Sequence, residues 1–280
     1  MKNVLTSVIL LSLNLPFIAS AGVINLGSAE DYIFATASNE QWGGNLLLGS
    51  EAHIFGSVAA SNTLELGDGV IVDGNACAKT TNNWGAIVNG VSTCDSFSQL
   101  ANDITGAATQ AQAFASTELG NITESSAITG SGFQSFNIKD LLLSGGETLT
   151  ITGGLTDSLV FNVFGQAQLG SGANILLQGG ITADNVIFNF VENPVNHSFE
   201  IGGANISGTF LSSGRSFILG DGATLNNSRF YSTESIVANV QDVRFPSSSI
   251  PSTPIAVPEP STLVLLLSAM LGLTLRRFKR

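Results

Sequence analysis

Leu66-Gly67-Asp68-Gly69-Val70-Ile71-Val72 ends one short apolar strand and begins the next through a glycine-containing turn. Glycine accepts the positive backbone φ that such a turn requires. Related copies occur at Leu48–Ile54, Leu169–Ile175 and Leu219–Leu225. The first two copies lie 18 residues apart, which suits one coil of a β-solenoid with three short sides. The recurring turn chemistry favours this fold over the alternative, a β-sandwich with ordinary glycine turns.

The strands between these turns alternate or are apolar on both faces. Glu147–Thr152 alternates, which predicts that Leu149 and Ile151 point inward and the threonines outward. Leu159–Phe164 and Val186–Phe190 are near-copies that are apolar on both faces, as in central strands. Their asparagines, Asn162 and Asn189, either stack as a hydrogen-bonded ladder between coils or occupy plain edge positions. Gly208–Ser212 and Ser216–Leu219 are expected to complete a later coil.

One segment, from Asp95 to Leu119, has the spacing of a helix. Ser96 and Gln99 fit a capping box, and Gly120 follows where a helix would stop. We therefore expect one long amphipathic helix near residues 96–119, lying along the solenoid and covering one of its faces. The apolar positions that share a helical face are Phe97, Leu100, Ile104, Ala107, Ala111 and Phe114.

The N-terminus has the pattern of a secretory signal peptide. Lys2 precedes an apolar core from Val4 to Ile18, and Ala19-Ser20-Ala21 fits the small-x-small cleavage pattern. Residues 1–21 are predicted to be removed, with Gly22 as the new N-terminus. The alternative is a transmembrane helix, which the short run and Pro16 disfavour.

The C-terminus combines a proline motif, an apolar run and a basic end. Val257-Pro258-Glu259-Pro260 precedes an uncharged run of 15 residues, Ser261–Leu275. This run is shorter than the ~20 residues of a usual helical span, although a short helix can cross a thinned bilayer. A buried C-terminal helix is the alternative, but an all-round apolar helix ending in cations suits a membrane better. The cations are Arg276, Arg277, Lys279 and Arg280.

Residues 257–280 resemble the PEP-CTERM sorting signal of bacteria. The resemblance implies export, a transient hold in the inner membrane by a short transmembrane helix, and processing by an exosortase. It also implies a final place at the cell surface or in the extracellular polysaccharide matrix. The sorting-signal residues would be Val257, Pro258, Glu259, Pro260, Arg276, Arg277, Lys279 and Arg280. Residues 246–256, rich in proline and serine, are expected to link this signal to a domain at 22–245.

Charge excludes several partners. The chain has 10 basic and 21 acidic residues, and the two ends hold five of the basic residues and Glu259. The remaining region therefore carries about −15, which argues against nucleic acid and against anionic lipid. The charged fraction is 11%, below the usual ~25%, as is typical of many short strands and tight turns.

The sequence offers one disulfide and no clear metal site. Cys77 and Cys94 are the two cysteines of an exported chain, so a disulfide is the simplest interpretation, with two buried thiols as the alternative. His53 and His197 do not have the spacing of metal ligands. No cofactor is expected.

The body of the chain, roughly Gly44 to Arg244, resembles the ice-binding-like β-solenoids and the choice-of-anchor A domains that precede PEP-CTERM-type tails. The resemblance rests on the glycine-rich strand starts, the alanine-rich helix and the Leu149-Thr150-Ile151-Thr152 and Phe161-Asn162-Val163 strands. It implies a mainly β fold: a discontinuous β-helix of triangular section, of either hand, with one α-helix alongside. It assigns no functional residues.

An enzyme is the disfavoured function. A polysaccharide lyase needs a base and cations, whereas five basic residues are scattered over the mature region. A catalytic triad would have to use one of the two histidines, and no Gly-x-Ser-x-Gly elbow precedes a helix. Turn positions explain four aspartates better than a Ca²⁺ site does. These are Asp68, Asp73, Asp184 and Asp221.

Two functions without catalysis remain. The first, which we expect, is a structural or adhesive protein of the cell surface or exopolysaccharide matrix (biofilm) that binds neutral glycans or other surface polymers. The export machinery and an exosortase-type enzyme would be further partners. The alternative is an ice-binding protein that uses a flat solenoid face. A rank of threonines at one position in successive coils would favour ice binding, and no threonine recurs across the four turn copies.

Overall fold

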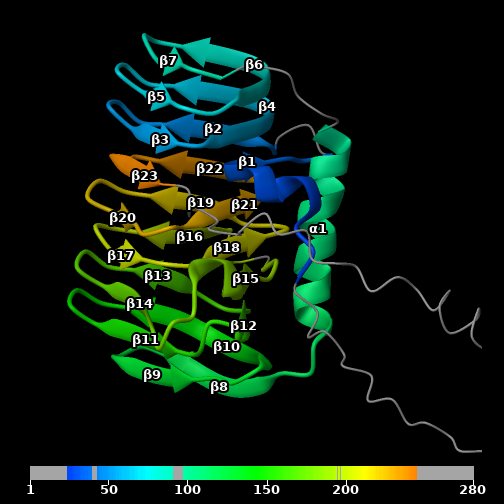
Figure 1. Ribbon diagram of the computed structural model, residues 1–280, viewed down its shortest axis with the longest axis vertical. Helices are drawn as coiled ribbons and strands as arrows, with labels where there is room; N and C mark the ends of the chain where they lie inside the picture. The colour runs from blue at the N-terminus through cyan, green and yellow to red at the C-terminus, as the bar shows by residue number, and fades with distance from the viewer. Residues whose placement is uncertain (1–23, 40–42, 91–96, 194, 196, 245–280) are drawn as a thin grey trace, which may run out of the picture. The chain divides into compact units, whose positions relative to one another are not determined.

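The computed structural model describes residues 24–39, 43–90, 97–193, 195 and 197–244. All described residues belong to one compact unit. They form a parallel β-solenoid with one long helix, α1 (Phe97–Ala113), alongside (Figure 1). The mainly β, solenoid-plus-helix prediction is confirmed. Two short 3₁₀ helices, Gly27–Asp31 (η1) and Ala183–Asn185 (η2), complete the described helices.

Each coil contributes strands to as many as three faces, A, B and C. Within the described residues, faces A and B together form a 14-stranded sheet that bends at the corner between them, and face C is a nine-stranded sheet. All pairings are parallel, as successive coils of one solenoid require.

Face A is made of β1 (Tyr32–Thr36), β12 (Ser158–Val163), β15 (Val186–Phe190), β18 (Thr209–Ser212) and β21 (Arg229–Ser232). Face B is made of β2 (Asn45–Leu48), β13 (Ala167–Leu169), β16 (Ser198–Ile201), β19 (Ser216–Leu219) and β22 (Ser235–Ala238). The strands β4 (Ser57–Leu66), β6 (Ala76–Asn83), β8 (Thr117–Ile122) and β10 (Phe133–Leu143) run through the corner from face A to face B. Face C is made of β3 (His53–Phe55), β5 (Ile71–Val72), β7 (Ile87–Val88), β9 (Ser126–Thr129), β11 (Thr148–Thr152), β14 (Asn174–Gln178), β17 (Asn205–Ile206), β20 (Thr224–Leu225) and β23 (Asp242–Arg244).

The four glycine turns of the sequence all lie at the corner between faces B and C. A ladder of backbone hydrogen bonds joins them to their neighbours, for example from Gly67 N to Leu48 O (2.9 Å) and from Gly220 N to Ile201 O (2.7 Å). A Cβ on Gly67 would lie 2.8 Å from the backbone nitrogen of Ser50, so a larger residue would force the two coils apart. The turn repeat therefore marks one corner of the solenoid.

The core is organised around a column of stacked phenylalanine rings. Phe188, fully buried on face A, has its ring centroid 5.0 Å from that of Phe161 and 5.3 Å from that of Phe210. Offset stacking at this distance adds to the free energy of apolar burial. The column exists because parallel pairing places one residue of each coil directly above its equivalent. Its members are Phe136, Phe161, Phe188, Phe210, Phe230 and Phe34.

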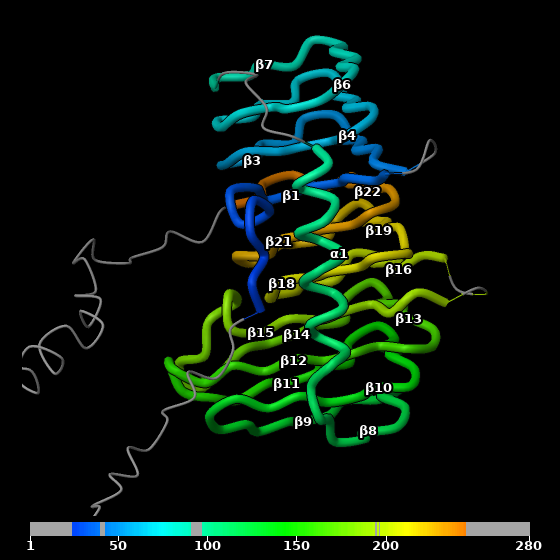
Figure 2. Tube along the Cα trace, turned by 90° about the vertical axis from the view of Figure 1, so that its right-hand side faces the viewer, coloured from blue at the N-terminus to red at the C-terminus, as the bar shows by residue number. Residues whose placement is uncertain are grey.

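The order of coils along the axis differs from their order in the chain (Figures 1 and 2). The chain starts in the middle with β1 to β3 and climbs through β4 and β5 to β6 and β7 at one end. Helix α1 then runs back along face A to the other end, where β8 begins the return. The last coil, β21 to β23, pairs with the first, β1 to β3. The first and last coils of the described chain are therefore neighbours in the middle of the solenoid.

Helix α1 docks on face A through apolar side chains and an asparagine ladder. Its buried positions include the predicted Leu100, Ile104, Ala107 and Ala111. The Nδ2 of Asn189 donates to the Oδ1 of Asn162 (2.9 Å), so of the two alternatives the ladder is present and the favoured plain edge position is wrong. The Nδ2 of Asn189 also donates to the helix carbonyl of Ala108 (3.2 Å), and the Nδ2 of Asn162 donates to that of Ala111 (3.1 Å).

The predicted C-terminal end of the helix is wrong. Helix α1 ends at Ala113, six residues before the predicted Leu119, and residues from Thr117 form strand β8. Phe114 leaves the helix to pack edge-to-face on Phe133, at 4.5 Å between ring centroids. Gly120, predicted to stop the helix, has φ 72° at the point where β8 shifts its pairing register at the corner. The packing of Phe114 on Phe133 therefore ends the helix, although the apolar spacing of the sequence continues at a helical period. The predicted cap residue Ser96 lies outside the described residues.

Other strand predictions are confirmed. Leu149 and Ile151 are fully buried and the threonines of β11 face outward. The near-copies β12 and β15 pair in register, with Phe161 opposite Phe188. They lie under α1, which explains why they are apolar on both faces.

Replacing Asn189 by alanine is expected to lower the free energy of unfolding by about 1–3 kcal/mol, the cost of leaving buried hydrogen-bonding groups without a partner. Asn189 is fully buried and joins face A to α1. Urea denaturation of residues 22–245 would measure the change. Asn205→Ala, at an exposed amide of face C, is the matched control and should stay within about 0.5 kcal/mol of the wild type. Equal effects of the two substitutions would contradict the ladder's role.

Candidate functional site

Most of the residues predicted from sequence to carry function lie outside the described residues. These are the signal-cleavage residues Ala19, Ala21 and Gly22, the sorting tail from Val257 to Arg280, and Cys94. Cys77 is described and is buried beneath α1 with Ala59 and Leu100. Its pairing with Cys94 stays a prediction. Among the described helices, none is long and apolar enough to cross a membrane.

Within the described residues, α1 is the element that lies over a face of the solenoid, and faces B and C carry no such cover. Helix α1 covers the middle of face A, where it contacts β12, β15 and β18 (Figure 2). A ligand that lies flat across the strands of several coils therefore has face B or face C available among the described residues.

Face B presents two straight columns of outward side chains. In each strand the buried residues alternate with outward ones, as in β19, where Phe217 and Leu219 point inward and Ser216 and Ile218 outward. Parallel pairing repeats this pattern coil by coil at about 4.8 Å.

The first column, which we call the small-polar column, carries hydroxyls in five of its six positions. Ser198 lies opposite Ser216, Asn45 opposite Ser235, and Thr63 opposite Thr80. The pairs are themselves adjacent, because Phe217 lies opposite Ile236 and Leu46 opposite Leu64. The column is Ser198, Ser216, Ser235, Asn45, Thr63 and Thr80.

The second column, which we call the central column, is apolar in its middle and polar at both ends. Ile218 lies opposite Val237, which lies opposite Leu47. Glu200 and Glu65 flank these three apolar residues on the adjacent coils. The centre of face B is therefore an uncharged patch, three coils deep, in which a hydroxyl or amide alternates with an aliphatic side chain.

Arg215 fixes the corner from which face B begins. Its side chain is fully buried and donates from Nε to Val191 O (2.7 Å), from Nη1 to Gly165 O (2.6 Å) and from Nη2 to Phe164 O (2.8 Å). Burial lowers the pKa of this guanidinium to about 10, so it stays charged at neutral pH. It binds the corner carbonyls of two neighbouring coils and so stiffens the edge beside Ser216.

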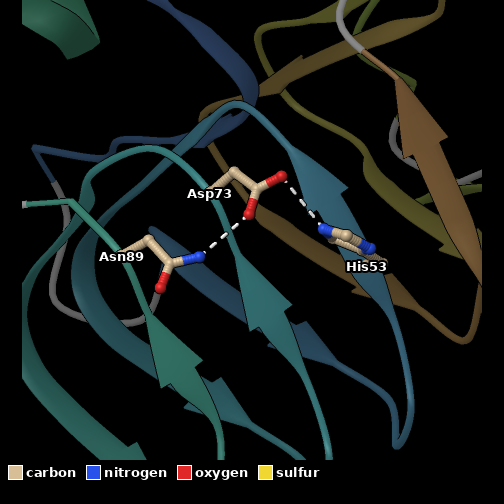
Figure 3. Close-up of polar contacts among 3 residues, drawn as sticks. All are labelled: His53, Asp73 and Asn89. Atoms are coloured by element: carbon tan, nitrogen blue, oxygen red, sulfur yellow. Dashed lines mark hydrogen bonds and ion pairs between the residues drawn. The ribbon is translucent and has the colours of Figure 1, made fainter.

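Face C carries a polar cluster near one end of the solenoid (Figure 3). The Nε2 of His53 lies 3.0 Å from one carboxylate oxygen of Asp73, and Asn89 Nδ2 donates to the other at 3.0 Å. Hydrogen bonds from His53 and then from Asn89 hold the pKa of Asp73 below its usual value. The His53 ring also stacks on Phe55, at 3.7 Å between centroids.

Among the described residues, no hydroxyl or thiol is placed in hydrogen-bond contact with the His53–Asp73 pair. Asn89 hydrogen-bonds to Asp73 and Phe55 stacks on His53, and neither of these side chains is a nucleophile. Asp73, predicted to be a turn residue, joins three adjacent strands of face C. Asp184 lies in η2 and pairs with Arg229 at 3.3 Å. In the described part of the chain, no three His, Cys, Asp or Glu residues are grouped to hold a metal ion.

Comparison with known proteins settles the nature of the tail. A family model described as the PEP-CTERM protein-sorting motif matches residues 256–280. The chain ends in a PEP-CTERM sorting motif. The motif implies an exported protein that is sorted to the cell surface and processed by an exosortase. Comparison with curated proteins finds no significant match.

The solenoid structurally resembles ice-binding proteins. One is the ice-binding protein of the Antarctic ascomycete Antarctomyces psychrotrophicus, with 16% identity over 81% of this chain and 100% of that chain and a TM-score of 0.52. A second, from an Antarctic biological consortium, has 19% identity over 79% of this chain and 90% of that chain, with a TM-score of 0.55. A third, from an Antarctic bacterium of the Flavobacteriaceae, has 20% identity and a TM-score of 0.55. This match covers 80% of the present chain and 47% of the Flavobacteriaceae protein. At these identities the likeness shows the fold.

Sequence reasoning missed the small-polar column. It sought threonine at one position in the turn copies, whereas the column mixes serine, threonine and asparagine and lies on the strands before the turns. The signal was present as a recurring polar-apolar-x-apolar quartet that ends in the turn. The quartets are Asn45–Leu48, Thr63–Leu66, Ser198–Ile201, Ser216–Leu219 and Ser235–Ala238.

Proposed function

We propose that this exported protein binds ice through face B. The observation that carries the proposal is the straight small-polar column beside the apolar centre of the central column. Hydroxyls at about 4.8 Å spacing can each hold a water molecule, and the rigid coils keep these waters in a repeating array. The aliphatic side chains between them limit competing hydrogen bonds to liquid water.

Charge favours face B over face C. The middle three coils of face B are uncharged at both outward positions, whereas face C presents Asp242, His53 and Arg244 on adjacent strands. The resemblance to ice-binding proteins supports a role of this kind for the fold, although it names no face of this chain. It also supports a function without catalysis.

Ile218→Lys is the variant that tests this proposal. Ile218 is 40% exposed in the centre of face B, so lysine should leave folding intact while placing a hydrated charge in the array. We expect inhibition of ice recrystallisation by residues 22–245 to fall to the level of buffer.

Leu176→Lys is the matched control, since Leu176 is 44% exposed on face C. It should retain wild-type activity. An inactive wild type, or equal loss in both variants, would refute ice binding through face B.

A structural or adhesive role in the cell-surface matrix is the second candidate, favoured by the sorting motif at residues 256–280. The five hydroxyls and the Asn45 amide of the small-polar column also suit hydrogen bonding to neutral glycans. Retention of the wild-type domain on an insoluble neutral glucan, together with no effect on ice crystals, would favour this role.

A further inference from the structure

A polar groove follows the corner between faces A and B, beside α1. Its volume is about 540 Å³, within the range of about 300–1,000 Å³ that is usual for ligand sites. Ala101 and Thr105 of α1 form one wall, and the turns that follow β15, β18 and β21 form the other. The groove therefore crosses several coils and lies apart from the centre of face B, although Ser216 borders both.

Two glutamates provide the negative charge of this groove. Glu192 follows β15 and Glu234 follows β21, and β18 lies between these strands. Two coil steps separate the two turns, or about 10 Å along the axis. The carboxylates can therefore contact different units of one extended ligand.

The positions of both glutamates are set by the corner turns. Glu192 lies over Gly214, where a Cβ would come within 2.7 Å of its Cγ, so only glycine leaves room for that side chain. Glu234 donates its backbone N–H to Ser232 Oγ (2.9 Å), and its carbonyl accepts from Gly44 N (2.7 Å). The turns thus set the backbone positions from which the two glutamate side chains reach the groove.

Among the described lining residues, His197 is the one basic side chain, and the rest of the lining is hydroxyl-rich and acidic. Hydroxyls from Ser38, Thr105, Ser213 and Thr233 line the groove, and none of its described lining residues is lysine or arginine. The whole mature region carries about −15, so its field attracts cations and repels acidic polymers. Hydroxyl partners together with two separated carboxylates match a chain of sugars that carry ammonium groups.

We propose that this groove binds a cationic amino-sugar oligosaccharide, with Glu192 and Glu234 pairing with ammonium groups and the hydroxyls contacting the sugar rings. The proposal does not rest on ice binding: neither glutamate lies in the two columns of face B, and Ser216 is the one column residue that lines the groove.

The test is calorimetric titration of residues 22–245 with three tetrasaccharides: glucosamine, N-acetylglucosamine and galacturonate. We expect the glucosamine tetramer to bind and the other two to bind far more weakly. Binding should weaken strongly at about 1 M salt, where charges are screened over about 3 Å. Glu192→Gln and Glu234→Gln should each weaken it by about 2- to 5-fold, as for solvent-accessible ion pairs.

Glu124→Gln is the matched control. The substitution removes the same charge, and Glu124 is exposed between β8 and β9 at the far end of the solenoid. It should leave affinity unchanged, and all three variants should unfold at the wild-type temperature. Equal binding of the acetylated tetramer, no binding of the glucosamine tetramer, or equal effects of Glu124→Gln and Glu192→Gln would overturn the proposal. Unchanged ice activity in Glu192→Gln would show that the two sites act separately.

Discussion

Phe188→Ala is expected to lower the free energy of unfolding of the solenoid by about 3–5 kcal/mol. The Phe188 ring is fully buried and stacks on Phe161 and Phe210 in the coils on either side. Alanine would leave a cavity in the column and remove both stacking contacts, which contribute about 0.5–1.5 kcal/mol each beyond burial. Against a total stability of about 5–15 kcal/mol, this loss is large.

Urea denaturation of residues 22–245 measures this change. Phe164→Ala is the matched control, since the Phe164 side chain is 40% exposed at the corner after β12. We expect the control to cost less than about 1 kcal/mol. If the two variants were equally stable, the phenylalanine column would not be the centre of the core.

Replacing Pro258-Glu259-Pro260 by three alanines is expected to stop maturation of the tail. The prolines keep the segment before the apolar run extended and free of helix, the form that a processing enzyme can bind. We infer that cleavage occurs close to Val257–Pro260 and releases the acidic domain to the cell surface. The variant should accumulate at full length in the inner membrane, with a folded solenoid.

Pulse-chase labelling and membrane fractionation would follow this maturation. Pro251→Ala with Pro254→Ala, in the predicted linker, changes the same residue type outside the motif and should mature at the wild-type rate. If the triple-alanine variant left the membrane as fast as the wild type, the tail would be only a weak anchor.

The fold could be predicted from short stretches of sequence, because a solenoid repeats the same glycine turns and short apolar strands in successive coils. Each glycine turn predicts the same corner of the solenoid, and the alternation of apolar residues in the strands predicts which side chains point inward. The order of coils could not be predicted, because the pairing of β1 with β21 joins residues almost 200 positions apart, such as Phe34 and Phe230. The helix end was missed because Phe114 and Ser116 bind to β10, through Phe133 and Ser135, and no local signal reports those contacts.

The candidate site was harder to predict than the fold. A column on one face is built from residues of different coils, and insertions such as the loop between β15 and β16 change their spacing in sequence. Ser198, Ser216 and Ser235 are 18 and 19 residues apart, but the next member along the axis is Asn45. The column appears only when the first and last coils are placed side by side.

The central claim, that face B binds ice, is tested most directly with a single growing ice crystal in a solution of fluorescently labelled residues 22–245. If face B binds ice, the wild-type domain and Leu176→Lys will label the ice and persist on it after the solution is exchanged. Ile218→Lys will be excluded into the liquid. Exclusion of the wild-type domain, or labelling of the ice by Ile218→Lys as bright as by the wild type, would contradict the claim.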